Sequence, residues 1–122
     1  MVYIKTSFFP YRLVLMRKEP VQLTIGLRND QKEARAYAIE LEVGRSLSIG
    51  NAGAKMNDFK HIGTLSPGQE KTIYYDIFAK AHAGDETIPV DVHVHELPKD
   101  SKGIHDIIQT FSRKLDLTVQ SR

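Results

Sequence analysis

Period-two alternation of apolar and polar side chains is the feature that most constrains the fold of this chain. It is clearest where Val21, Leu23, Ile25 and Leu27 alternate with polar or small residues. Successive side chains of a β-strand point to opposite faces, so this pattern predicts a strand with one buried face and one wet face. The same alternation predicts further strands at Tyr37–Val43, Ile73–Ile77, Val90–Val94 and Leu115–Val119.

Weaker patterns and the turns between them complete the predicted architecture. Ser66–Gln69 contains a proline and a glycine, which suit the fixed and the positive φ of a tight turn. Several short strands separated by turns predict an all-β, antiparallel immunoglobulin-like β-sandwich of about seven strands. The weaker strands are expected at Val2–Ser7, Leu13–Met16, Leu47–Ile49 and Phe59–Leu65.

One segment near the C-terminus departs from the alternation. Ile104, Ile107, Ile108 and Phe111 follow the i, i+3, i+4, i+7 spacing of a two-turn helix. Short apolar runs are ambiguous, so the same residues also fit an extended approach to the last strand. A short helix over Ile104–Ser112 is therefore one of two predictions for this segment.

Length and composition restrict the classes of function. The 122 residues fit a single domain, 1–122. The chain has no cysteine, which excludes disulfides and thiolate chemistry. Its 17 basic residues are scattered among 15 acidic ones, whereas a nucleic-acid-binding surface needs clustered cations, so no nucleic-acid partner is expected.

No apolar run in the sequence is long enough to span a membrane, and the first residues lack the apolar core of a signal peptide. We therefore expect a cytoplasmic protein. The alternative is an extracellular location, if the sequence has lost a signal or an anchor.

Two stretches resemble a known family. Glu19–Asn29 is a strand that ends in an asparagine-containing turn, and Ile62–Ile73 places a Pro-Gly-Gln turn before an alternating strand. Together they resemble the CARDB-like and related immunoglobulin-like modules, and the whole pattern is similar to a small stand-alone archaeal protein of unknown function. The resemblance implies a seven-stranded sandwich with a role in adhesion or assembly, and it implies no catalytic residues.

Histidines are the candidate metal ligands. His93 and His95 lie two apart on a predicted strand, so their imidazoles share one face and suit zinc or copper. A complete site needs a third ligand, for which His61, His82 and His105 are the candidates. The alternative is that these histidines only decorate a wet face, and on that interpretation the protein has no cofactor.

Catalytic patterns are missing from the sequence. No nucleophile elbow or phosphate-binding loop is present, and Glu40 and Glu42 have the spacing of a solvated strand face. We therefore expect a protein that is not an enzyme.

Two surfaces are predicted to mediate contacts. Ala34, Ala36 and Ala38 alternate along one strand and form a flat face that admits close approach. The strand Lys114–Gln120, with Lys114, Asp116 and Thr118 outward, has no proline or glycine to protect it as an edge. A homodimer through either surface is the expected assembly.

Aromatic residues leave further alternatives open. The cluster Ser7–Tyr11 is expected in the core, with an aromatic docking site as the alternative. The leading hypothesis for function is a non-enzymatic protein-interaction or assembly module. Its rivals are a metal-binding domain that uses the histidines and a carbohydrate- or surface-binding accessory domain that uses Tyr3, Tyr11 or Tyr74.

Overall fold

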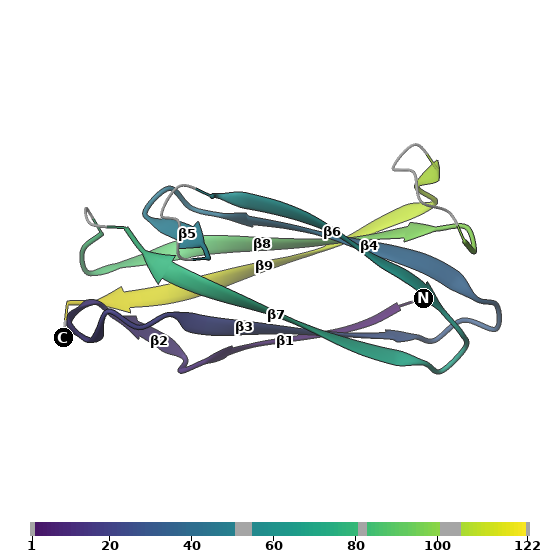
Figure 1. Cartoon of the computed structure of the whole chain (residues 1–122), viewed down its shortest axis with the longest axis horizontal. Helices are drawn as coiled ribbons and strands as arrows, with labels where there is room; N and C mark the ends of the chain where they lie inside the picture. Colours follow the sequence, from purple (N-terminus) through teal and green to yellow (C-terminus); the bar gives the residue numbers. More distant parts are fainter. Residues whose placement is uncertain (1, 51–54, 81–82, 101–105, 122) are drawn as a thin grey trace.

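Two β-sheets stack face to face in the computed structural model, which describes residues 2–50, 55–80, 83–100 and 106–121 (Figure 1). The strands of these ranges are β1 (Val2–Phe9), β2 (Arg12–Val14), β3 (Val21–Asn29), β4 (Arg35–Val43), β5 (Leu47–Ile49), β6 (Asn57–Leu65), β7 (Glu70–Ala79), β8 (Glu86–Leu97) and β9 (Gln109–Gln120). A 3-10 turn, η1 (Leu15–Arg17), follows β2.

The strand order confirms the predicted sandwich. One sheet has the order β1-β3-β7-β5 and the other has the order β2-β9-β8-β4-β6. Neighbouring strands are antiparallel except β2 and β9, which are parallel. The described residues form nine strands rather than about seven, because all four weaker segments form strands as well as the five with clear alternation.

The core lies between the sheets and consists of the alternate residues that the pattern predicts. Leu23 and Ile25 of one sheet and Ile39 and Leu41 of the other have no exposed surface. Each side chain of this size stabilises the fold by about 1.5–3 kcal/mol when it is fully buried. The remaining predicted core residues belong to the same cluster, with Leu115 at its partly buried margin: Tyr37, Ile73, Tyr75, Val92, Val94, Leu115 and Leu117.

Of the two predictions for the segment Ile104–Ser112, the described residues 106–112 show the extended approach to the last strand and not the two-turn helix. β9 begins at Gln109, and the backbone N–H of Ile108 already donates to the carbonyl of Glu96 at 2.7 Å. The long partner β8 therefore extends its ladder into this segment, and pairing overrides the short helical spacing. Ile104 lies outside the described residues.

The two stretches that carry the family resemblance meet in space at Asn29. The backbone N–H of Gly68 donates to Asn29 O at 2.7 Å, and Asn29 N–H donates to Gln69 O at 3.1 Å. The buried side chain of Asn29 donates from Nδ2 to the carbonyls of Glu33 and Leu65, both at 2.9 Å. This asparagine therefore joins the β3–β4 turn to the β6–β7 turn across the two sheets.

Candidate functional site

The outer face of the five-stranded sheet brings His93 and His95 of β8 onto one surface, as the sequence predicts. His95 Nδ1 lies 2.8 Å from Thr110 Oγ1 on β9, and His93 Nδ1 lies 2.7 Å from Ser112 Oγ. The other ring nitrogen of each histidine faces a glutamate of β4. His95 Nε2 lies 3.2 Å from Glu40 Oε1, and His93 Nε2 lies 4.0 Å from Glu42 Oε1.

These contacts form two parallel rows of hydroxyl, imidazole and carboxylate across β9, β8 and β4. The hydroxyl and carboxylate partners were not predicted as site residues, because Glu40 and Glu42 look like a solvated face in the sequence. The register of the β4–β8 ladder identifies the glutamates as partners. Glu40 pairs with His93 and Ala38 with His95, so the even-numbered residues of β4 share a face with the two histidines. His95 is also held by Phe59, whose ring stacks on it with centroids 6.1 Å apart.

The predicted metal site lacks a third ligand in the described part of the chain. No group of three or more histidine and acidic side chains there has the geometry to hold a metal ion. His61 has an interaction partner of its own, and His82 and His105 lie outside the described residues. The geometry of the two rows supports hydrogen bonding between strands, and metal binding at His93 and His95 stays a prediction.

The predicted alanine face is not on the surface. Ala36 and Ala38 have no exposed area and form a small cluster with Leu97, while Ala34 is half-buried. The segment after β8 reaches across β4, because Asp100 contacts Thr64 of β6 and Thr64 pairs with Ala36. The side chains of Ala36 and Ala38 are therefore small because other parts of the chain and side-chain rings cover them. The contact face predicted at these alanines is wrong.

The predicted edge at the C-terminal strand is partly open. β9 pairs with β8 from Gln109 to Val119, but on its other side β2 covers only Thr118–Gln120. No strand of the described ranges pairs with Gln109–Leu117 on that side. Lys114 and Asp116 are exposed on this free edge, whereas Thr118 is half-buried and paired with Arg12.

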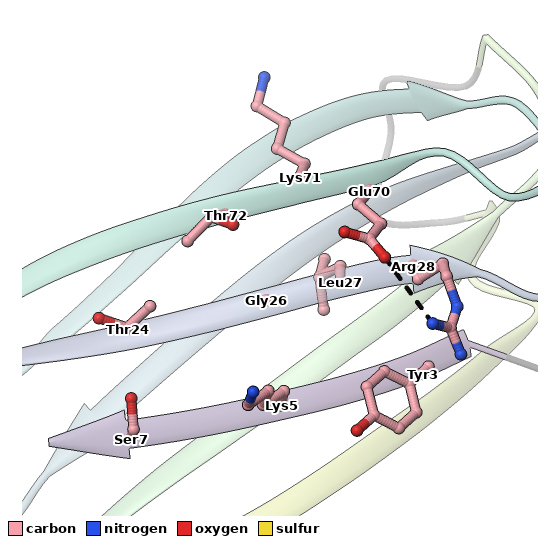
Figure 2. A pocket seen from close by; sticks show the side chains of 10 residues that line it. All are labelled: Tyr3, Lys5, Ser7, Thr24, Gly26, Leu27, Arg28, Glu70, Lys71 and Thr72. Atoms are coloured by element: carbon pink, nitrogen blue, oxygen red, sulfur yellow. Dashed lines mark ion pairs between the residues drawn. The ribbon is translucent and has the colours of Figure 1, made fainter.

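A shallow groove of about 520 Å³ lies on the outer face of the four-stranded sheet (Figure 2). Gly26 of β3 leaves its floor bare between Lys5 of β1 and Thr72 of β7. Arg28 closes one end, with its guanidinium carbon 4.6 Å from the centre of the Tyr3 ring. Lys5 and Lys71 carry additional positive charge into the lining.

The guanidinium group of Arg28 already forms ion pairs with two carboxylates. Its Nε lies 2.6 Å from Asp30 Oδ1, and its Nη1 lies 3.7 Å from Glu70 Oε1. The hydrogen bond from Arg28 lowers the pKa of Asp30 and raises the pKa of Arg28 itself. Tyr74 is exposed on the same sheet face as Tyr3, but Tyr11 lies in the turn before β2.

Comparisons with known proteins support the fold and no more. No model of a protein family matches the chain, and no curated protein sequence matches it. The solved structures that resemble it share little sequence. Salmonella alpha-2-macroglobulin matches at 13% identity with a TM-score of 0.70, over 98% of this chain and 7% of that one.

Two further structures extend the comparison. BcpA, the major pilin subunit of Bacillus cereus, matches at 12% identity with a TM-score of 0.64, over 98% of this chain and 40% of that one. AvmM, described as a catalyst of macrocyclization in alchivemycin A biosynthesis, matches at 6% identity with a TM-score of 0.59, over 98% of this chain and 88% of that one. The chain thus spans well under two thirds of the macroglobulin and the pilin.

The immunoglobulin-like sandwich predicted from the sequence is therefore confirmed as the fold. The CARDB-like resemblance and the archaeal origin stay predictions. The described residues contain no helix of the length and apolar character needed to cross a bilayer.

Proposed function

We propose that this chain is a non-enzymatic interaction module that pairs with a second copy of itself along the free edge of β9. The observation that carries the proposal is the unpaired stretch Gln109–Leu117, which presents backbone donors and acceptors without a proline or glycine. Such an edge is a template for strand addition.

The charges on this edge are self-complementary, because each copy presents both a lysine and an aspartate. In an antiparallel pair of β9 strands centred on Leu115, Lys114 of each copy stands directly opposite Asp116 of the other. Both side chains point to the outer face, so the symmetric pair contains two facing ion pairs. Opposite charges directly across an antiparallel pair stabilise it by about 0.2–1 kcal/mol each.

The apolar side of the same register is also favourable. Leu115 is half-buried at the margin of the core, and in this register it meets Leu115 of the second copy. The dimer would continue the five-stranded sheet across its two-fold axis, which is the commonest symmetry of oligomers. The fold itself occurs as part of larger chains in the macroglobulin and in a pilin subunit, which supports a role in assembly.

The test is charge reversal with rescue. Asp116→Lys places lysine opposite lysine at both contacts, so we expect the dimer dissociation constant to rise about tenfold or more. The double variant Lys114→Asp with Asp116→Lys restores opposite charges and should restore the dimer. Analytical ultracentrifugation over a concentration series measures the constant, and thermal unfolding verifies that each monomer is folded.

Lys60→Asp on β6, the opposite edge of the same sheet, is the matched control and should leave dimerisation unchanged. A parent protein that is monomeric at every concentration contradicts the proposal. So does a dimer that Lys60→Asp weakens as much as Asp116→Lys does.

The cytoplasmic location expected from the sequence stays a prediction.

A further inference from the structure

The three most exposed large apolar side chains among the described residues lie in one short stretch. Phe9 is 79% exposed, Met16 is 70% exposed and Tyr11 is 69% exposed. The sequence favoured a core position for the cluster Ser7–Tyr11, but only Phe8 packs against the core. Exposing an aromatic ring to water is unfavourable, so a local concentration of such side chains marks a contact surface.

Cationic residues alternate with these side chains along the sequence. Arg12, Arg17 and Lys18 belong to the same stretch, in which no acid occurs before Glu19. Pro10, Arg12, Arg17 and Glu19 line one small depression, so the 3-10 turn η1 lies against the β1–β2 turn. We call Phe9, Tyr11, Met16, Arg12, Arg17 and Lys18 together the basic apolar tip.

The acids near the tip are few. Glu19 is exposed beside Lys18, and Asp76 of β7 lies in the same cross-strand row as Phe9, with Gln22 between them. Arg12 is partly committed, since it donates to Tyr11 Oη at 2.7 Å and lies over the Tyr11 ring. Arg17 and Lys18 are both exposed, and they leave the tip positively charged.

The apolar side chains of the tip are exposed and do not sit in a hollow. The β1–β2 turn lies in the half of the sandwich in which β9 finishes (Figure 1). Phe9, Tyr11 and Met16 line neither the groove on the outer sheet face nor a second hollow of about 320 Å³, whose lining includes Lys18. An exposed group of aromatic and thioether side chains cannot enclose a peptide, but it can enter a layer that deforms around it.

We propose that the basic apolar tip binds the chain peripherally to an anionic lipid surface. Phe9 and Met16 would enter the boundary between headgroups and acyl chains, and the Tyr11 ring would lie at headgroup level, where tyrosine is enriched. Arg17 and Lys18 would contact lipid phosphates, with their aliphatic stems along the apolar layer. The proposal does not rest on the β9 dimer, because its residues lie at the β1–β2 turn, β2 and η1 and not in the free stretch Gln109–Leu117.

Sedimentation with vesicles tests this proposal on the full chain. Vesicles of phosphatidylcholine and phosphatidylglycerol in equal parts should bind the protein, and vesicles of phosphatidylcholine alone should bind it far less. High salt should weaken binding to the anionic vesicles, because it screens the attraction. A tryptophan placed by Phe9→Trp should shift its emission to the blue with anionic vesicles, and Tyr74→Trp on the outer sheet face should not.

Variants separate the two parts of the tip. Phe9→Ser with Met16→Ser should weaken vesicle binding about tenfold or more, because the buried apolar area is lost. Arg17→Gln with Lys18→Gln should weaken it about fivefold per cation removed. Tyr74→Ser and Lys60→Gln are the controls, since both residues are exposed elsewhere, and they should bind like the parent.

Binding that the tip variants leave unchanged overturns the proposal, as does equal binding to neutral and anionic vesicles. A protein partner captured through Phe9 and Met16, with no binding to either vesicle, also overturns it and assigns the tip to a protein contact. The substituted residues Phe9, Met16, Arg17 and Lys18 are exposed, so circular dichroism of each variant should match the parent and loss of binding will not report unfolding.

Discussion

At the scale of single residues, Ala38 shows how strongly a neighbouring strand can change the environment of a small side chain. It lies between His61 of β6 and His95 of β8, and it has no exposed surface. A larger or charged side chain there must displace the rings and chain that cover it.

We expect Ala38→Asp to lower the free energy of unfolding by about 3–5 kcal/mol, because it buries an unpaired carboxylate. Urea denaturation followed by circular dichroism measures the change. Ala34→Asp is the control, since Ala34 is half-buried just before β4. Equal losses at the two positions would mean that Ala38 is not covered as described.

Asn29 is the residue on which the two turn motifs depend. We expect Asn29→Ala to cost about 2–4 kcal/mol, because the carbonyls of Glu33 and Leu65 both lose their donor in a buried environment. Asn57→Ala, at an exposed position that begins β6, should change stability by less than about 0.5 kcal/mol. Similar values for both variants in a urea titration would show that the junction at Asn29 contributes little.

At the scale of elements, the corner between β4 and β5 carries the chain from one sheet to the other. An added Cβ at Gly44 would approach Ile88 Cγ2 to 2.4 Å. Backbone hydrogen bonds fix this corner, since Gly44 N–H donates to Pro89 O at 3.0 Å and Leu47 N–H donates to Gly44 O at 2.9 Å. The glycine therefore allows β8 to pass close to the corner.

We expect Gly44→Ala to destabilise the protein by about 1–3 kcal/mol, because the extra methyl group overpacks the site against Ile88. Gly84→Ala is the matched control, since nothing lies within 4 Å of its added Cβ. Thermal unfolding of the two variants side by side provides the comparison. A Gly44 variant as stable as the Gly84 variant would contradict the close approach.

The elements also show what the sequence can predict and where it stops. Alternation predicts β3, β4, β7 and β8 well, because each has one face in the core and the period is read directly from the residues. The segment before β9 was ambiguous because a short apolar run fits two periods, and the length of β8 decided between them. The burial of Ala36 and the exposure of Phe9 depend on which strands are neighbours, which no local pattern encodes.

The candidate sites also divide into features that a local pattern predicts and features that depend on which strands are neighbours. The shared face of His93 and His95 follows from spacing within one strand, and it is confirmed. Their partners Thr110, Ser112 and the glutamates come from other strands, so they required the sheet register. The basic apolar tip required the placement of η1 against the β1–β2 turn.

At the scale of the whole molecule, two tyrosines connect the sheets through their hydroxyl groups. Tyr37 of β4 donates to Asn29 Oδ1 of β3 at 3.3 Å, and Tyr75 of β7 donates to Asp58 Oδ2 of β6 at 3.0 Å. Burial raises the pKa of Tyr37 to about 12, and burial together with the hydrogen bond to Asp58 also raises the pKa of Tyr75.

These shifts predict sensitivity to alkali. Both tyrosines ionise in the unfolded chain near their ordinary pKa of 10.0, but the folded protein resists their ionisation. Their contribution is complete below that pH and is lost as pH rises toward the folded value, so stability should fall above about pH 10. Tyr37→Phe with Tyr75→Phe should fall less steeply in urea unfolding across this range, whereas Tyr74→Phe should follow the parent. Identical slopes for all three proteins would contradict the assignment.

The parallel contact between β2 and β9 has a consequence for a pulling force. β1 begins in one half of the long axis and runs toward the end at which β9 finishes (Figure 1). Tension applied through Val2 and Ser121 would run along the strands, so it would slide β1 against β3 and β2 against β9 instead of opening one hydrogen bond at a time. The hydrogen bonds of each ladder are then loaded in shear and must break together. The molecule should therefore resist stretching far better along this axis than across it.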